Sequence, residues 1–278
     1  GLLFALITAS FSLIYSVTRV LHLAHGAVMI AAGYAFYTGL TLWHWPLWLA
    51  IIFAIIIATA LGLLINSQIY ERMRKNGVVS IAGTLIATIS ILLIIQNVLL
   101  AVFGSATKFF SALQGQVHTF GTVNVTDNEV RIIILCPILL ILLTLFLSKT
   151  RIGKALRAVA DNEMVAEVVG ISARRMRMMV FGIGSALAGI AGILFAIEYS
   201  LVPSMVVMAT LAMFFRTILG GIGSIGGAVL GSLLIETVIA LTGWYWNIGW
   251  VQLTSFIFTF LVLLIRPHGL LGKIKRSL

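Results

Sequence analysis

Charged residues are too scarce in this sequence to cover the surface of a soluble domain. Asp, Glu, Lys and Arg make up 9% of the 278 residues, whereas hydrophobic residues make up 61% and the mean hydropathy is +1.14. The apolar residues form runs of about 20, the length that an α-helix needs to cross a membrane. We therefore expect an all-α, polytopic transmembrane helical bundle with about eight or nine crossings, in a single domain over residues 1–278.

Motifs for redox, metal and nucleotide chemistry are also missing. Cys136 is the only cysteine, so no disulfide framework or C-x-x-C site can form, and a buried, inert thiol is expected. The sequence has no G-x-x-x-x-G-K-[ST] loop to hold the phosphates of ATP. His22 and His25 stand close together, but no cysteine or carboxylate completes a zinc pattern. Since no Ser/His/Asp set has a recognisable spacing, we expect neither a catalytic centre nor a metal or cofactor bound by this chain.

The positive charge is concentrated in a few segments. The net charge is +10, and 14 of the 18 Lys and Arg residues form three clusters and a C-terminal group. These are Arg72, Arg74 and Lys75; Lys149, Arg151, Lys154 and Arg157; Arg174, Arg175 and Arg177; and Arg266, Lys273, Lys275 and Arg276. Basic loops stay cytoplasmic, so the pattern predicts a cytoplasmic C-terminus rather than nucleic-acid binding. The outer loop, residues 103–129, lacks this excess.

Two polar or glycine-rich segments interrupt the apolar sequence at what should be membrane depth. They are HLAHGAVMIAAGYAFYTG, residues 22–39, and GGIGSIGGAVLGSLLIE, residues 220–236, which share GAVM and GAVL. Lipid offers no water to backbone N–H and C=O groups, so such breaks persist only where protein covers them or where they line a cavity. We expect two broken helices, related by an internal repeat, at a translocation site.

Polar side chains inside the apolar runs need partners or a wet cavity. Gln96 and Asn97 either hydrogen-bond a neighbouring helix or contact a solute. Arg216 and Glu236 either hold the second break together as an ion pair or take part in the pathway. Arg19 and Glu198 lie near segment ends, and we expect them to snorkel to the interface. The candidate pathway residues are His22, His25, Gly26, Gln96, Asn97, Arg216, Gly220, Gly221, Gly223, Ser224 and Glu236.

The most charged stretch, residues 148–178, is predicted to be a cytoplasmic loop that contains a short amphipathic helix. Asp161 is placed to cap a helix over residues 162–169, and Gly170 is placed to end it. The valines of this helix form an apolar stripe from which its carboxylates are set off. Such a helix either rests on lipid headgroups or docks a soluble partner.

Docking is favoured because uphill transport would need a separate source of energy. The chain lacks the ATPase loop and also the intramembrane chain of acids that a proton relay requires. A separate ATP-hydrolysing subunit that binds the loop 148–178 would supply the energy. The candidate coupling residues are Asp161, Glu163, Met164, Val165, Glu167, Val168 and Gly170.

Four segments carry a resemblance to a known family. They read LIYSVTRVLHLAHGAVMIAAGY, SKTRIGKALRAVADNEMVAEVVGIS, ILGGIGSIGGAVLGSLLIE and LVLLIRPHGLLGK. In this order they resemble the permease subunits of branched-chain amino acid ATP-binding-cassette importers, and within that family the first of two related permeases. The similarity extends over nearly the whole chain.

The resemblance implies a multi-pass permease domain in a bacterial or archaeal cytoplasmic (inner) membrane. Its implied partners are a second permease subunit, two cytoplasmic subunits that bind ATP and Mg, an extracytoplasmic solute-binding protein and the lipid bilayer. It also implies that residues 160–171 are the coupling region and that the breaks at residues 25–26 and 220–227 line the pathway. The implied solute is a branched-chain or other hydrophobic amino acid.

The sequence also departs from that family's pattern. Ala27 follows the His-Gly pair where members have Glu, Gly226 stands where they have Pro, and Arg216 lies in a segment that is usually alanine-rich. These changes alter the polarity of the pathway, so urea or short-chain amides stay open as substrates. A stand-alone secondary carrier or facilitator is the alternative function, and a membrane-embedded enzyme is a third.

Overall fold

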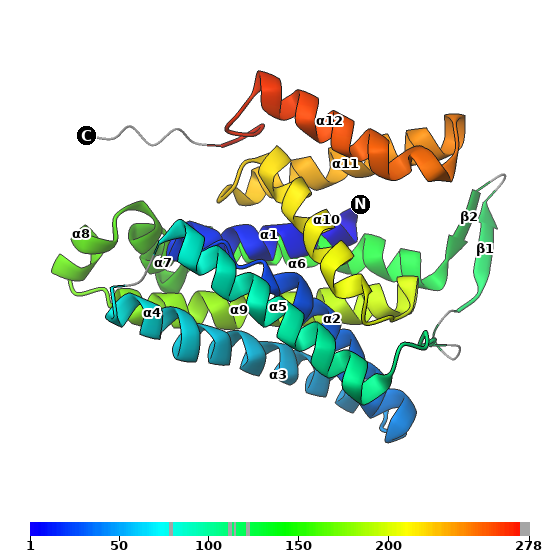
Figure 1. Ribbon diagram of the computed structural model, residues 1–278, viewed down its shortest axis with the longest axis horizontal. Coiled ribbons are helices and arrows are strands. Elements are labelled where there is room, and N and C mark those ends of the chain that lie inside the picture. The colour runs from blue at the N-terminus through cyan, green and yellow to red at the C-terminus, as the bar shows by residue number, and fades with distance from the viewer. Residues whose placement is uncertain (78–79, 111–112, 114, 121–122, 273–278) are drawn as a thin grey trace.

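The secondary structure of the protein is almost entirely helical (Figure 1). The computed structural model describes residues 1–77, 80–110, 113, 115–120 and 123–272. Its α-helices are α1 (Leu2–Thr18), α2 (Ala24–Tyr37), α3 (Leu47–Ile65), α4 (Glu71–Lys75), α5 (Ile81–Phe103), α6 (Asp127–Lys149), α7 (Arg151–Asp161), α8 (Glu163–Val168), α9 (Ala173–Tyr199), α10 (Met205–Gly220), α11 (Ile225–Tyr245) and α12 (Val251–Ile265). The π-helical turns η1 (Thr38–Leu42) and η2 (Asn66–Tyr70) extend α2 and α3, and a 3-10 turn, η4 (Ile248–Trp250), precedes α12.

Among the described residues, five helical segments are long and apolar enough to cross a membrane. They are Leu47–Lys75, Ile81–Phe103, Asp127–Lys149, Ala173–Tyr199 and Ile225–Tyr245, and α1, α10 and α12 are shorter apolar helices. The prediction of a polytopic helical membrane protein is therefore confirmed. The number of crossings, eight or nine, stays a prediction.

A small antiparallel sheet is the exception to the expected all-α fold. It pairs β1 (Val117–Phe120) with β2 (Val123–Thr126) inside the predicted outer loop. Thr126 then starts α6 through a capping box, in which its backbone N–H donates to Glu129 Oε2 at 2.8 Å. The sheet forms in a polar segment, so this local pairing was not visible in the hydropathy pattern. Residues 111–112, 114 and 121–122 of that loop lie outside the described part of the chain.

Helix α9 is the centre of the bundle. Buried residues make up 78% of its apolar stretch, and α1, α2 and α3 all pack against it. Small residues allow these close approaches: a Cβ added to Gly189 would lie 3.0 Å from Ala58 Cβ in α3. In α5 and in α6, by contrast, only 22% of the residues in the apolar stretch are buried. The apolar outer faces of these two helices are therefore available to lipid or to another subunit.

The two ends of the bundle differ in charge and structure. Helices α4, α7 and α8 lie together at one end, named the basic end here, and the β1–β2 sheet lies at the opposite end (Figure 1). The basic clusters of residues 72–75, 149–157 and 174–177 are on the elements that meet at the basic end. This agrees with the predicted grouping of these loops on one side of the membrane. Lys273, Lys275 and Arg276 of the C-terminal group lie outside the described residues.

Each predicted break is a turn between two consecutive helices. Residues 19–23 link α1 to α2, and residues 221–224 link α10 to α11. Both turns face the basic end (Figure 1). The internal repeat that would relate the two helix pairs stays a prediction.

Candidate functional site

The turn between α1 and α2 is buried and held by polar side chains of its neighbours. His22 and His25 have no exposed surface. A hydrogen bond of 2.9 Å joins His22 Nδ1 to Tyr70 Oη, and one of 2.8 Å joins His25 Nε2 to Ser10 Oγ. The backbone N–H of Ala24 donates to Thr88 Oγ1 at 2.9 Å. The break is therefore covered by α1, η2 and α5 in this conformation, as lipid requires.

The two imidazoles keep one unused nitrogen each. Their ring centroids are 5.7 Å apart, and within the described part of the chain neither His22 Nε2 nor His25 Nδ1 has a hydrogen-bond partner. Buried polar atoms without partners are uncommon and costly. Among the described residues, no group of three or more His, Cys, Asp or Glu could hold a metal ion.

Gly26 is the point where α2 meets α10. A Cβ at this position would lie 2.8 Å from Thr210 Cα and 3.0 Å from Thr210 Cβ. Neither atom can move without shifting the helix, so Gly26 permits a close helix crossing. The predicted pathway residue thus has a packing role in this conformation.

The turn between α10 and α11 is covered by the segment that follows α12. Residues 266–272, named the strap here, follow α12 and cross the end of α10. Leu270 N–H donates to Leu219 O at 2.9 Å, and Leu271 N–H donates to Gly220 O at 3.0 Å. The strap thereby satisfies carbonyls that the end of a helix leaves free. Its sequence, RPHGLLG, is part of the family resemblance, but its contact with α10 was not predicted.

The predicted glycines and serine of this second turn serve its backbone geometry. Gly221 and Gly223 have φ values of 102° and 86°, which side chains rarely adopt. A Cβ on Gly221 would also lie 2.8 Å from Gly272 Cα in the strap. Ser224 caps α11, because its Oγ accepts from the Gly227 N–H at 3.1 Å.

Arg216 and Glu236 form an ion pair between α10 and α11. The pair lies within the helices rather than at the turn between them. Arg216 Nη1 also donates to Ala212 O at 2.8 Å, and its guanidinium carbon lies 4.0 Å from the centre of the Phe4 ring. Two roles were considered for Arg216 and Glu236, an ion pair and a part in the pathway. The structure contains the ion pair.

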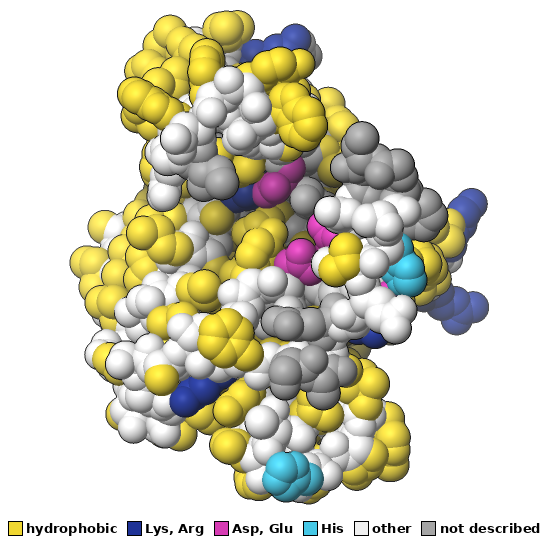
Figure 2. Space-filling model, turned by 90° about the vertical axis from the view of Figure 1, so that its right-hand side faces the viewer, with side chains coloured by type: hydrophobic (Ala, Val, Ile, Leu, Met, Phe, Trp, Pro, Cys, Tyr) yellow, Lys and Arg dark blue, Asp and Glu magenta, His cyan; other side chains and the backbone are white. Residues whose placement is uncertain are grey.

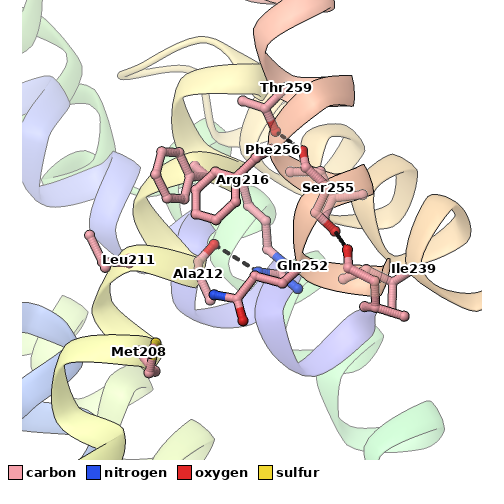
Figure 3. A pocket seen from close by; sticks show the side chains of 12 residues that line it. Met208, Leu211, Ala212, Arg216, Ile239, Gln252, Ser255, Phe256 and Thr259 are labelled. Carbon is pink, nitrogen blue, oxygen red and sulfur yellow. Dashed lines mark hydrogen bonds between the residues drawn. The ribbon is translucent and has the colours of Figure 1, made fainter. Parts of the chain in front are cut away.

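A cavity of about 330 Å³ opens beside Arg216, between α10, α11 and α12 (Figure 3). Its walls are mostly apolar, and α12 adds the polar side chains of Gln252, Ser255 and Thr259. None of these α12 residues was predicted to belong to the pathway. Isolated Ser, Thr and Gln in an apolar helix carry no signal that would distinguish them from helix-packing residues.

Within the described residues, neither amide side chain of α5 has a hydrogen bond to a neighbouring helix. Asn97 is exposed, and its Nδ2 donates to Leu93 O of the same helix at 2.8 Å. Gln96 is partly buried, and its Oε1 has no partner among the described residues. Among the described residues, the amide of Asn97 thus bonds its own helix, and the two roles considered for Gln96 and Asn97 stay predictions.

The predicted amphipathic helix is α8, which begins and ends near the expected residues. Its cap is Asn162, whose side chain accepts from the Val165 N–H at 3.1 Å. The prediction that Asp161 caps it is wrong, because Asp161 is the last residue of α7. Gly170 ends the helix as predicted, with a φ of 85°.

The apolar side chains of α8 point away from the protein. Val168 is 83% exposed and Met164 is 77% exposed. Val165 and Val169 are exposed as well, whereas Ala166 on the opposite face is buried. Exposed apolar patches on otherwise polar elements mark contact surfaces.

Ion pairs of Arg177 attach α8 to the membrane helices. Arg177 of α9 pairs with Glu163 of α8 and with Glu71 of α4. Arg19, in the α1–α2 turn, donates to Ala160 O of α7 at 2.7 Å. Arg74 donates to Thr18 O at the end of α1. The contact of Arg19 thus connects the loop 148–178 to the α1–α2 turn, and the contact of Arg74 connects α4 to the end of α1.

The two residues expected to snorkel both have protein partners. Arg19 is exposed and also bonds α7, as described above. Glu198, at the other end of the molecule, accepts a hydrogen bond of 2.6 Å from Asn128 Nδ2. Figure 2 views that end and shows acidic side chains gathered near the middle of the face.

Comparisons with known proteins point to one family. The family model described as the permease component of a branched-chain amino acid transport system matches residues 1–266. The high-affinity branched-chain amino acid transport system permease protein BraD of Pseudomonas aeruginosa is 29% identical, with 98% of this chain and 92% of the relative covered. LivH of Escherichia coli K12 is 31% identical with the same coverage. A probable LivH of Methanocaldococcus jannaschii is 29% identical over 99% of this chain and 92% of its own length. No solved structure matches.

Proposed function

The chain belongs to the family of permease components of branched-chain amino acid transport systems, and from this membership we propose that it is the membrane subunit of an ATP-driven importer. The proposed solute is a branched-chain or other hydrophobic amino acid. The proposed complex contains a second permease, two cytoplasmic ATP-binding subunits that hold ATP and Mg, and an extracytoplasmic solute-binding protein. Residues 1–278 form its permease domain in the bacterial or archaeal inner membrane, with the C-terminus in the cytoplasm.

The exposed apolar face of α8 carries the proposal. A short helix with three exposed apolar side chains, followed by a fourth on Val169, would be unfavourable in water unless a partner covers it. Its anchoring to α4 and α9 by Arg177 gives a rigid connection from that partner to the membrane helices. We assign the ATP-binding subunit as the partner, because this chain has no nucleotide-binding loop of its own.

The proposed mechanism is alternating access. Closure of the ATP-binding subunits displaces α8 and the loop 148–178. The contacts of Arg177, Arg19 and Arg74 pass this displacement to α9, α4 and the α1–α2 turn. The helices that meet at Gly26 and at the α10–α11 turn then re-orient, so the buried pathway residues become accessible in turn.

A double substitution in α8 tests the docking role. In Val165→Asp/Val168→Asp, two charges replace the apolar contact while the anchoring of α8 is untouched. We expect normal membrane insertion but loss of ATPase stimulation and of leucine uptake by the assembled transporter in proteoliposomes. Ile152→Asp in α7, another exposed apolar residue of the same loop, is the matched control. Unchanged uptake by the double variant would contradict the docking role.

The same assay separates the alternatives for function and substrate. ATP-independent uptake by this chain alone would favour a stand-alone carrier or facilitator and contradict the importer. Competition by unlabelled urea or acetamide, without competition by leucine or valine, would favour the alternative substrates. Ala27 and Gly226, the departures from the family pattern, would then be the first residues to exchange.

A further inference from the structure

We propose that the cavity between α10, α11 and α12 binds an amino acid by its carboxylate, with Arg216 as the group that receives it. This deepens the proposed function, because it takes the solute to be an amino acid. Two features of the cavity support it: a guanidinium with an unsatisfied donor and a wall of suitable chemistry.

Arg216 lines the cavity and has unused hydrogen-bonding capacity. A guanidinium has five N–H donors; Nη1 uses Ala212 O and Nη2 uses Glu236. Nε has no partner among the described residues, although the Arg216 side chain is only 6% exposed. Leaving a charged donor buried and unpaired is costly. A carboxylate can accept from Nε and an Nη together, the geometry for which arginine is suited.

The wall of the cavity suits a small apolar side chain. Met208, Leu211, Phe215, Ile239 and Phe256 line it. Its volume of about 330 Å³ is at the lower end of small-molecule sites, about 300–1,000 Å³. Ser255 and Thr259 donate their hydroxyl hydrogens to carbonyls of their own helix at 2.7 Å and 2.8 Å. Their oxygens can still accept, and the Gln252 side chain offers a further polar contact.

Cysteine protection in the assembled transporter tests the site. Cys136 is the only cysteine of the chain, so Cys136→Ala gives a background without thiols, into which Gln252→Cys is introduced. The complex in lipid nanodiscs is treated with a maleimide, and labelling of this chain is followed over time. We expect leucine to slow labelling and leucinol, which lacks the carboxylate, to leave it unchanged. Thr144→Cys, in a different groove between α6 and α11, is the control that leucine should not protect.

A second pair of substitutions isolates Arg216. Arg216→Gln alone would leave Glu236 unpaired and could prevent folding, so Arg216→Gln/Glu236→Gln replaces the pair with two neutral amides. We expect this double variant to assemble with normal yield. The leucine concentration for half protection should rise by about 10-fold to 100-fold, the loss for one charged hydrogen bond.

Each outcome has one meaning. Protection by leucine and not by leucinol, lost in the neutral pair, supports the site. Equal protection by both compounds, protection that survives in the neutral pair, or a cysteine at position 252 that never reacts would overturn it. If the wild-type transporter takes up no leucine at all, the proposed function fails instead; if uptake is normal but protection is absent, only the site fails.

Discussion

The guanidinium of Arg177 is bonded to the carboxylate of Glu71 inside the basic end. Nε lies 2.6 Å from Glu71 Oε1 and Nη2 lies 3.1 Å from Oε2, while the two side chains are 8% and 6% exposed. The two residues are 106 positions apart in the sequence. Because Arg177 also bonds Glu163, one side chain fixes α4, α8 and α9 relative to one another.

Arg177→Met should destabilise the protein by about 3–5 kcal/mol, because it leaves Glu71 buried without its charge partner. Thermal unfolding in detergent measures the change. Arg177→Met/Glu71→Met should recover most of the loss, since replacing a whole buried pair by apolar groups is often neutral. Equal losses in the single and the double variant would contradict the importance of pairing at this position.

Glu163→Gln is expected to have a much smaller effect on stability. The Glu163 side chain is 43% exposed, and exposed ion pairs contribute about 0–1 kcal/mol. Uptake is the more sensitive measurement here, since Glu163 connects α8 to Arg177. We expect weaker coupling of ATP hydrolysis to transport at nearly unchanged thermal stability. A melting temperature lowered as far as in Arg177→Met would contradict this assignment.

Tyr70→Phe should destabilise the protein by about 1–3 kcal/mol, because it leaves His22 Nδ1 buried without a partner. Tyr34→Phe is the matched control. The Tyr34 hydroxyl is buried and has no partner within the described residues, so removing it should be neutral or stabilising. The two variants are compared by thermal unfolding, and equal effects would show that the bond to His22 contributes nothing.

Gly26→Ala should destabilise the protein by about 1–3 kcal/mol through overpacking, since the added carbon meets the backbone of Thr210 at 2.8 Å. Gly226→Ala is the control at the start of α11, where an added Cβ meets nothing within 4 Å. There we expect a neutral change or a gain of up to about 1 kcal/mol from helix propensity. A tolerated alanine at Gly26 would mean that α2 and α10 are not in close contact.

Gly269→Ala should loosen the strap. Gly269 has a φ of 76°, which costs an alanine about 1–2 kcal/mol, and the new carbon would lie 2.5 Å from Gly221 Cα. We expect a lower melting temperature and faster proteolysis after α12. Gly243→Ala, where a Cβ meets nothing within 4 Å, should show neither effect. Unchanged protease resistance in Gly269→Ala would contradict the bonding of the strap to α10.

Local features of the chain were predictable because their causes are local. The scarcity of charge and the long apolar runs required membrane helices, and the basic clusters were grouped as the structure groups them. Gly170 ended α8 as predicted because a left-handed residue after a helix favours glycine. Only the cap was misplaced by one residue, since the polar residues 161 and 162 are both able to cap and only the end of α7 decides between them.

By itself, the sequence determined that this is a multi-pass helical membrane protein of a permease family, and where its turns and its short amphipathic helix lie. The tertiary structure alone decided which polar groups meet: Arg177 with Glu71, His22 with Tyr70, and the strap with the end of α10. Hydropathy and capping act within a few residues along the chain, whereas these pairs depend on how distant helices pack. The cavity beside Arg216 belongs to the second class, because α10, α11 and α12 form it only when they are assembled.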